Sequence, residues 1–513
     1  MKKKLIINSL YLFLLGVLSS FSLPPYNYFL INFFTFSLFF IFLFKNLEKS
    51  SFKKFLFYGW LFGYGYFLSS LYWISISLTF DNNFRFLIPI SIIIIPALLA
   101  LFYSLISFIF YLIRFKNILS AFFLFSLLFG VIEFIRGHIL TGFPWNLIVY
   151  SLSKELNFIS IISIIGTYSL NLLIISLFTL PAILILKKSS KNILVCIAFL
   201  ILPIIFFYHG LNIKRDFFNS PEVSNNTTIR IIGSNISLDR YYKENQSENV
   251  LKELIKISNP DPNKKTFFIW PEGIIPDIYQ DELFLYKDIF GKNFNQNHII
   301  ALGINNRQVV DGKEKFFNSL SIFDGNLNLI KNYNKINLVP FGEFLPLEKI
   351  LNKIGLKTVT NNYQSYTRGK KRGVISINNN LFKLDILPLI CYEIIYSGSI
   401  SKNDNFDFIL NISEDGWFGE SIGPKQHFVH GIFRAIENGK YVIRSANNGI
   451  AAIINPIGLI EKKVNFGDNG YVDFEDRRNN KPTPFSTYGN KIFSLFILLY
   501  IFLIILFNKI KNE

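Results

Sequence analysis

The sequence is poor in the residues from which metal and disulfide sites are built. Its 513 residues include two cysteines, Cys196 and Cys391, and five histidines. Cys196 lies inside an apolar run and Cys391 in a mixed segment, with no CxxC or Cys/His spacing typical of zinc sites. We therefore expect no disulfide, no metal and no cofactor.

Charged residues are also scarce. Only 17% of the chain is charged, whereas 51% is apolar, which is too apolar for a soluble protein of this length. The formal net charge of +17 comes mostly from lysines and arginines beside apolar runs, and no basic run is interleaved with aromatic residues. The charge pattern therefore excludes nucleic acid as a partner and indicates membrane topology instead.

Long apolar runs are what the chain has in abundance. A bilayer core is crossed by about 20 apolar residues in a helix. Eight runs meet this length, at residues 5–22, 28–44, 55–79, 86–113, 118–135, 157–186, 192–209 and 490–508. They predict a membrane domain of about seven helices at 1–211, a mixed domain at 212–489, and a final transmembrane helix with a short cytoplasmic tail at 490–513.

Basic residues flank one set of helix ends. Fourteen lysines and arginines fall on the side of the two termini: Lys2, Lys3, Lys4, Lys45, Lys49, Lys53, Lys54, Arg114, Lys116, Lys187, Lys188, Lys191, Lys509 and Lys511. The positive-inside rule then predicts cytoplasmic termini and places the mixed domain outside the cytoplasm. Residues 1–22 also fit a signal peptide, and their removal would leave that domain on the same side.

The mixed domain alternates short apolar runs with helix-like stretches. Strands are predicted at 228–236, 265–273, 298–306, 318–324, 384–393 and 406–413, and helices at 248–257 and 426–438. This alternation predicts an α/β domain with a sheet core.

Three apolar runs lead into a polar residue. The three polar residues are Glu272 in "WPEG", Lys335 in "NYNKINLVPFGEFLP" and Cys391 in "LICYE". A lone cysteine after an apolar run is more often a packed core residue than a nucleophile. A nucleophilic role requires a base for the thiol proton and a cation for the developing negative charge. Glu272 and Lys335 supply these groups, and both interpretations of Cys391 stay open at this point.

The histidines are less suited to act as the base. His298 follows a loop, and His427 and His430 lie on a predicted helix where they could equally face solvent. In the apolar part, Glu133 and Arg136 are three residues apart and could pair on one helix face. Trp145 follows in "LTGFPWN", where an interfacial anchor and a lipid contact are both compatible with the sequence.

Several motifs resemble those of a known family. The strings "IWPEG", "YNKINLVPFGE" and "ICYE" resemble, in this order, the Glu-Lys-Cys signature of the nitrilase (carbon–nitrogen hydrolase) superfamily. Together with "TGFPWN", "LVPFGEFLP", residues 72–74 and the long string at 411–458, they resemble the apolipoprotein N-acyltransferase family over almost the whole chain.

The resemblance implies a multi-pass α-helical membrane bundle in a bacterial inner membrane plus an α/β nitrilase-like αββα sandwich on its periplasmic side. The family moves an acyl chain from a membrane phospholipid to the α-amino group of the diacylglyceryl-cysteine that begins an apolipoprotein. By resemblance Cys391 is the nucleophile that forms a thioester, Glu272 the general base and Lys335 the stabiliser of the tetrahedral intermediate. Supporting roles fall to Glu343, Tyr392 and Glu393, and substrate contacts to Tyr242, Trp417 and Trp145.

Two departures concern substrate binding. Asn337 stands where many relatives have histidine, and Tyr242 where the family tends to have tryptophan. We expect Lys335 to lower the pKa of the Cys391 thiol. We also expect the protein to be a monomer and to act on a phospholipid donor and a diacylated apolipoprotein acceptor. The alternatives are a membrane-anchored amidase, in which water hydrolyses the thioester, and a non-catalytic scaffold.

Overall fold

The protein is described by a computed structural model. It describes residues 2–310, 312–351, 353, 358, 364–379, 381–399, 405–478 and 482–509. The chain forms two compact units. The first comprises Met1–Ser75, Phe84–Arg215 and Thr483–Glu513, and the second comprises Ile76–Asn83 and Asp216–Pro482.

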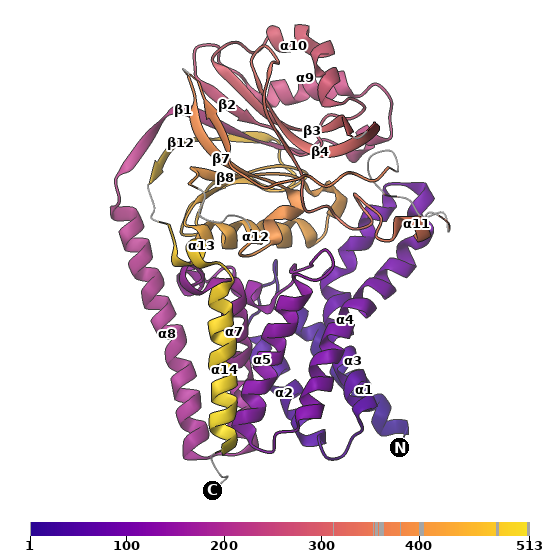
Figure 1. Cartoon of the computed structure of the whole chain (residues 1–513), viewed down its shortest axis with the longest axis vertical. Coiled ribbons are helices and arrows are strands. Elements are labelled where there is room, and N and C mark those ends of the chain that lie inside the picture. Colours follow the sequence, from indigo (N-terminus) through magenta and orange to yellow (C-terminus); the bar gives the residue numbers. More distant parts are fainter. Residues whose placement is uncertain are drawn as a thin grey trace. The chain divides into compact units, whose positions relative to one another are not determined.

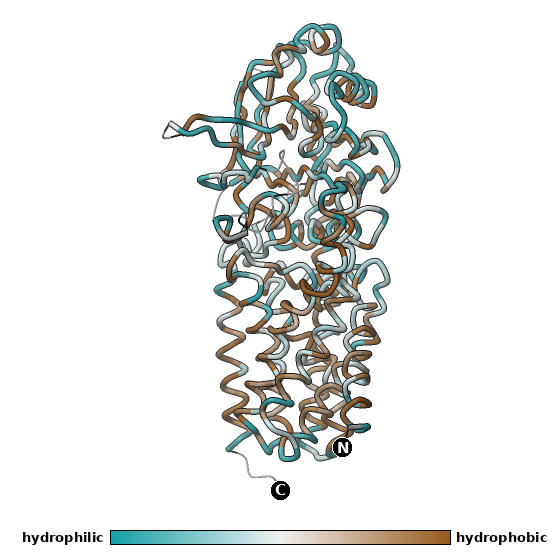
Figure 2. Tube along the Cα trace, turned by 90° about the vertical axis from the view of Figure 1, so that its right-hand side faces the viewer, coloured by the Kyte–Doolittle hydropathy of each residue, from teal (hydrophilic) through white to brown (hydrophobic). Residues whose placement is uncertain are grey.

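The first unit is built from apolar helices. They are α1 (Lys2–Ser20), α2 (Ile31–Asn46), α3 (Phe52–Leu71), α4 (Ile88–Ile113), α5 (Ile118–Arg136), α6 (Leu156–Ile159), α7 (Ile162–Leu186), α8 (Ser190–Asn219), α13 (Pro484–Tyr488) and α14 (Lys491–Lys509). Within the described residues, six helices are long and apolar enough to cross a membrane, and the apolar α2 is shorter. Figure 2 shows their predominantly hydrophobic residues in brown. This composition fits a membrane protein.

The third predicted span does not continue as one helix to residue 79. Helix α3 ends at Leu71, and two 3₁₀ helices, η1 (Tyr72–Thr79) and η2 (Asn82–Leu87), lead into α4. The Ser70 hydroxyl donates to the Tyr66 carbonyl, and Trp73 Nε1 donates to the Ser70 carbonyl. The Trp73 side chain thus bonds the Ser70 carbonyl, which a continuing α-helix would offer to a backbone N–H, whereas the Ser70 hydroxyl bond is of a kind found inside helices.

The second unit contains a 12-stranded sheet. Its strands are β1 (Glu222–Ser234), β2 (Thr266–Ile269), β3 (His298–Val310), β4 (Lys313–Asp324), β5 (Leu329–Asn334), β6 (Ile375–Asn378), β7 (Lys383–Ile390), β8 (Phe408–Glu414), β9 (Tyr441–Asn447), β10 (Ala451–Ile454), β11 (Ile460–Val464) and β12 (Gly470–Arg478). The main order is β5-β4-β3-β2-β1-β9-β8-β7-β6, while β12 pairs with β1 and β10 with β9 and β11. Strands β1 and β9 pair only at Gly233 and Ser234, so two halves of the sheet meet at this corner.

Helices cover both outer faces of the folded sheet (Figure 1). Helices α9 (Ser247–Ser258) and α10 (Lys287–Gly291) pack on the β1–β3 half through a core that includes Leu251, Trp270 and Phe290. Helix α12 (Gly423–Asn438) covers the β9 half. This arrangement confirms the predicted αββα sandwich, and α9 and α12 lie where the sequence predicted helices.

Parallel pairing explains why distant residues meet. Strands β2, β1, β9, β8 and β7 are parallel to their neighbours in this order. The carboxyl ends of parallel strands share one edge of a sheet, and loops at that edge commonly form ligand sites. Residues after β2, β7 and β8 are therefore brought to the same region.

Candidate active site

Glu272 follows β2 and is buried. Its Oε1 accepts hydrogen bonds from Asn318 Nδ2 at 2.8 Å and Lys335 Nζ at 2.9 Å, and its Oε2 accepts from the Glu414 backbone N–H at 3.0 Å. The next residue, Gly273, has a φ of +51°, a left-handed conformation that glycine adopts without strain. The turn therefore directs the carboxylate into the interior, where three donors hold it.

Lys335 follows β5 and is only 1% exposed. Its Nζ lies 2.9 Å from an oxygen of Glu272 and 2.9 Å from an oxygen of Glu343. Burial by itself lowers the pKa of this lysine, but the two carboxylates together outweigh it and raise the pKa well above its ordinary value. Lys335 is therefore a fixed buried cation.

Glu343 completes the carboxylate pair around Lys335. Its Oε1 accepts from Asn318 Nδ2 at 2.6 Å, and its Oε2 accepts from the Val339 N–H at 2.8 Å. Burial raises the pKa of Glu343, the Lys335 ammonium lowers it, and the net direction is upward. Asn318, on β4, thus bridges both carboxylates, although nothing in its local sequence distinguishes it from other polar strand residues.

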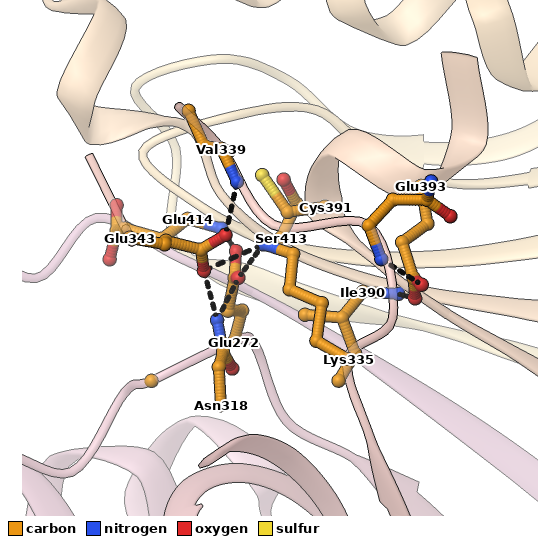
Figure 3. Close-up of polar contacts among 12 residues, drawn as sticks. Glu272, Asn318, Lys335, Val339, Glu343, Ile390, Cys391, Glu393, Ser413 and Glu414 are labelled. Atoms are coloured by element: carbon orange, nitrogen blue, oxygen red, sulfur yellow. Dashed lines mark hydrogen bonds and ion pairs between the residues drawn. The ribbon is translucent and has the colours of Figure 1, made fainter. Parts of the chain in front are cut away.

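Cys391 lies directly after β7, at the start of the 3₁₀ helix η8 (Cys391–Ile395), as Figure 3 shows. Its φ of +49° is uncommon for a residue other than glycine and marks a strained turn. Burial raises the pKa of the thiol well above its ordinary value, Glu272 raises it further, and Lys335 lowers it. Lys335 therefore lowers the thiol pKa as the sequence predicted, but desolvation and the Glu272 carboxylate outweigh the lysine, so the net direction of the pKa is upward.

Glu393 links the cysteine turn to the segment after Lys335. The fully buried carboxylate accepts from five donors: the Ile336, Asn337 and Ile390 N–H groups at 2.9, 3.1 and 2.9 Å, Tyr333 Oη at 3.0 Å, and Arg372 Nη2 at 2.8 Å. Two of these N–H groups follow Lys335 and one precedes Cys391. Glu393 therefore fixes the chain around the lysine relative to the chain around the cysteine.

The structure brings together the three residues predicted as catalytic, together with Glu343 and Glu393 (Figure 3). Tyr392 is buried directly after Cys391, and its ring meets Tyr396 edge-on, with centroids 5.5 Å apart. A buried cation, a carboxylate and a thiol at one strand edge form a set that can perform acyl transfer through a covalent intermediate. Among the described residues, no group of three or more histidine, cysteine or acidic side chains is placed to hold a metal.

The predicted substrate contacts lie in different surroundings. The Trp417 ring is stacked 5.6 Å from Tyr241, and the hydroxyl of Tyr241 donates to the Gly273 carbonyl. Tyr242 is 44% exposed. The tyrosine that contacts the turn after Glu272 is therefore Tyr241. The sequence analysis did not select it, because Tyr242 stands where the family tends to have tryptophan.

Trp145 belongs to the first unit and is 3% exposed. Its ring lies 4.9 Å from that of Trp73 and is stacked on Phe143 at 6.2 Å. Neighbouring aromatic rings therefore cover Trp145, and its role as an interfacial anchor stays a prediction. Its contact with a substrate stays a prediction.

Helix α12 also differs from expectation. His427 and His430 are both buried, so the prediction that they could face solvent is wrong. Nε2 of His427 lies 3.2 Å from the backbone carbonyl oxygen of Cys391, and its Nδ1 lies 2.9 Å from Asp415. Asp415 belongs to the "NISEDGWFGE" string, whose acidic pair after a strand was the available signal for a buried charge.

Two family models match the chain in sequence. One is the apolipoprotein N-acyltransferase N-terminal domain, over residues 15–180, and the other is carbon-nitrogen hydrolase, over residues 229–472. Apolipoprotein N-acyltransferase of Rickettsia prowazekii is 34% identical over 98% of both chains. The protein of the same name from Wigglesworthia glossinidia brevipalpis is 35% identical over 88% of this chain and 89% of its own length.

Solved structures of the nitrilase superfamily also match about half of the chain. An amidase from Nesterenkonia is 11% identical, with a TM-score of 0.33, over 51% of this chain and 94% of its own. A superfamily member from Saccharomyces cerevisiae is 15% identical, with a TM-score of 0.33, over 48% of this chain and 90% of its own. The nearly full-length similarity to the curated relatives identifies the chain as a member of the apolipoprotein N-acyltransferase family.

Proposed function

We propose that this protein transfers an acyl chain from a membrane phospholipid to the α-amino group of the N-terminal diacylglyceryl-cysteine of apolipoproteins, through a thioester on Cys391. The observation that carries the proposal is the buried ammonium of Lys335, 2.9 Å from each of two carboxylates, in electrostatic contact with a thiol at a strained turn. Membership of the family supports the same substrates.

The first half-reaction makes the thioester. Because the raised pKa keeps the resting Cys391 thiol neutral, Glu272 takes its proton as Sγ attacks the ester carbonyl of the phospholipid. Lys335 stabilises the oxyanion that develops on the carbonyl, and one such donor contributes about 3 to 4 kcal/mol to lowering a barrier. When the ester C–O bond breaks, the proton held by Glu272 passes to the departing lysophospholipid oxygen.

The second half-reaction makes the amide. The α-amino group of the diacylated lipoprotein attacks the thioester carbonyl, and Glu272 removes a proton from the nitrogen. Lys335 again stabilises the oxyanion until the C–S bond breaks. The proton then returns to the thiolate, whose high pKa favours the neutral thiol. One acyl chain has moved from oxygen to nitrogen, and the enzyme is restored.

The setting of this chemistry follows from the sequence pattern. The apolar helices fit a bacterial inner-membrane protein. The flanking basic residues support cytoplasmic termini and a periplasmic catalytic domain. We propose functional divisions at 1–211, 212–489 and 490–513, and a monomer as the active form. Both lipid substrates would then be taken from the outer leaflet.

A reconstituted assay tests the proposal. Purified protein is incubated with phospholipid and a synthetic diacylated lipopeptide, and both protein and peptide are weighed by mass spectrometry. We expect the peptide to gain one acyl chain, and protein incubated with phospholipid alone to carry an acyl adduct on Cys391. Release of free fatty acid without acylated peptide would instead identify a hydrolase, and the absence of both products would contradict any catalytic role.

The two cysteines provide a matched pair of variants. Cys391→Ala should abolish the adduct and the acylated peptide, because no other group at the site can form the thioester. Cys196→Ser should keep both, since Cys196 lies in α8, where its Sγ is 4.0 Å from the Leu180 carbonyl oxygen. Activity retained in Cys391→Ala would overturn the mechanism.

A further inference from the structure

A buried polar cluster supports Cys391 on the side of α12, and the steps above do not use it. We call Ser413, Asp415, His427 and Arg444 the backing cluster. All four side chains are buried. They come from three elements: Ser413 and Asp415 from the end of β8 and the turn after it, His427 from α12, and Arg444 from β9. The cluster therefore connects three elements to the turn that carries the nucleophile.

Asp415 is the centre of the cluster. Arg444 Nη2 lies 3.0 and 2.7 Å from its two carboxylate oxygens, and Ser413 Oγ donates to Oδ1 at 2.7 Å. Burial alone would raise the pKa of Asp415, but Arg444 and His427 lower it well below its ordinary value. Asp415 is therefore a fixed anion, and the charge of Arg444 balances it.

His427 spans the distance from this anion to the nucleophile's backbone. Its Nδ1 is 2.9 Å from Asp415 Oδ1 and its Nε2 is 3.2 Å from the Cys391 carbonyl oxygen. A carbonyl oxygen can only accept, so a hydrogen bond at Nε2 requires a proton on that nitrogen. In the imidazolium, Nδ1 also donates to Asp415. In the neutral ring with Nε2–H, Nδ1 can accept from Arg444 Nη2 at 3.2 Å. Both of these forms keep the donor that faces Cys391. The other neutral form, with its proton on Nδ1, would donate to Asp415 and turn the Nε2 lone pair toward the carbonyl oxygen, so the contact with Cys391 favours the two forms that carry Nε2–H.

The same cluster also reaches the thiol. Ser413 lowers the pKa of the Cys391 thiol, and its hydroxyl donates to Asp415. The backbone carbonyl of the cysteine is contacted by His427, and Ser413 acts on its thiol. Both of these residues contact the same carboxylate.

We propose that His427 is a positioning residue for the acyl-transfer reaction, which holds the Cys391 carbonyl through Nε2–H and so aims Sγ at the ester carbon. The cysteine turn has a left-handed φ of +49°, and such a conformation persists only where its surroundings fix it. Loss of the Nε2–H donor would let the peptide group rotate. Displacement of a reacting atom by about 1 Å can lower a rate about 100-fold.

Two isosteric variants separate the two ring contacts. His427→Gln places an amide nitrogen near the position of Nε2, and His427→Asn places one near Nδ1. Gln should therefore keep the donor to Cys391, whereas Asn should keep only the contact with Asp415. His430→Gln is the matched control, because His430 is equally buried three residues further along α12.

The inference rests on the proposed function of the same site, so two readouts are taken in a Cys196→Ser background. The first is the rate of thioester formation with phospholipid, resolved into kcat and KM. The second is the rate of Cys391 alkylation by iodoacetamide, which requires no lipid. Melting temperature in detergent is measured for each variant.

We expect His427→Asn to lower kcat for thioester formation about 10- to 100-fold with KM unchanged. The kcat of His427→Gln should stay within about threefold of the parent value, and so should that of His430→Gln. Alkylation rates should fall in the same order, and the melting temperatures of Asn and Gln should agree.

Three results would overturn the inference. The first is equal activity of His427→Asn, His427→Gln and the parent, and the second is an equal loss of activity in both variants together with a lowered melting temperature. The third is a larger loss of activity in His427→Gln than in His427→Asn. A parent that forms no thioester at all would instead remove the proposed function. The alkylation rates would still decide whether His427 positions the thiol.

Discussion

The helical unit and the α/β unit both bury charge, but they do so differently. In the helical unit Glu133 and Arg136 lie three residues apart on α5 and form a buried ion pair. In the α/β unit the buried ammonium of Lys335 pairs with Glu272, which is 63 residues away, and with Glu343. One arrangement comes from a single helix face, and the other requires the complete fold.

The helical pair serves the loop that follows it. Arg136 donates to the Phe143 carbonyl and, at 3.3 Å, to Asn146 Oδ1, while Tyr103 Oη donates to Glu133 Oε1 at 2.6 Å. Both charges are thus satisfied by protein groups and hold the "TGFPWN" turn in place. This ion pair is expected to stabilise the "TGFPWN" turn, because any other conformation of the turn would leave a buried charge without partners, which is costly.

The α/β arrangement includes a reactive group among its charges. Cys391 is in electrostatic contact with Glu272 and Lys335. Long-range convergence of a cation, a carboxylate and a thiol is difficult to explain by stability alone, since apolar residues of similar volume often stabilise a core as well. Buried charged groups therefore indicate a catalytic site where they come from distant segments of the chain and surround a nucleophile.

The largest expected effect is that of Lys335→Met. It leaves Glu272 and Glu343 buried without their cation, which should destabilise the fold by about 3 to 5 kcal/mol. It also removes the oxyanion donor, so thioester formation should fall by at least about 100- to 1,000-fold. Thermal unfolding and the mass of the acyl adduct measure the two effects. Adding Glu343→Gln should restore part of the stability and none of the activity; restored activity would contradict the role of the lysine.

Arg136→Met applies the same change to the helical unit. Glu133 then loses its cation, and we expect a loss of about 3 to 5 kcal/mol in thermal unfolding. The double variant Glu133→Gln/Arg136→Met should recover most of this loss, because no unpaired charge remains. Alkylation of Cys391 should keep its parental rate in all variants. A slower alkylation would show that the two sets of buried charges are coupled, and would contradict their separate roles in the two units.

Glu393→Gln tests whether long-range charge pairing positions the site. The change removes the carboxylate that forms an ion pair with Arg372 and should cost about 1.5 to 3 kcal/mol, with thioester formation lowered about 10- to 100-fold. Glu437→Gln is the control, because Glu437 forms a buried ion pair with Arg434 on one helix, 2.8 Å apart. It should lower stability to a similar extent and leave thioester formation unchanged. Equal effects of both variants on the reaction would refute the special role of Glu393.

Local pattern was enough to predict an α/β domain with a sheet core and to place the strands that lead to Glu272, Lys335 and Cys391, whereas the αββα sandwich followed from the family resemblance. Apolar runs that end in a polar residue are visible in one dimension, and parallel strands bring their ends to one edge. Each of the eight apolar runs likewise overlaps at least one helix, although α2 is short and α3 stops at Leu71. At that boundary the Trp73 side chain bonds the Ser70 carbonyl, a contact that hydropathy does not contain.

The remainder depends on tertiary packing. His427, Arg444 and Asn318 are polar residues on ordinary elements, and only the assembled fold shows that they are buried around the site. The net direction of the thiol pKa could not be predicted for the same reason: Lys335 lowers the pKa as expected, but the extent of burial, which outweighs the lysine, is not visible in the sequence. Desolvation is a property of the whole environment rather than of a motif.

The smallest expected effect separates two neighbouring tyrosines. Tyr241→Phe removes a hydroxyl that donates to the Gly273 carbonyl and accepts from Arg240 Nη2 at 3.0 Å, so the turn that carries Glu272 loses one support. We expect kcat for acyl transfer to fall about 3- to 10-fold, equivalent to about 0.7 to 1.4 kcal/mol, with KM unchanged. Tyr242→Ala should instead raise KM for the lipopeptide, if the exposed ring contacts the acceptor as predicted. Steady-state kinetics with varied lipopeptide distinguish the two, and a KM effect in Tyr241→Phe would place Tyr241 among the substrate contacts rather than behind the general base.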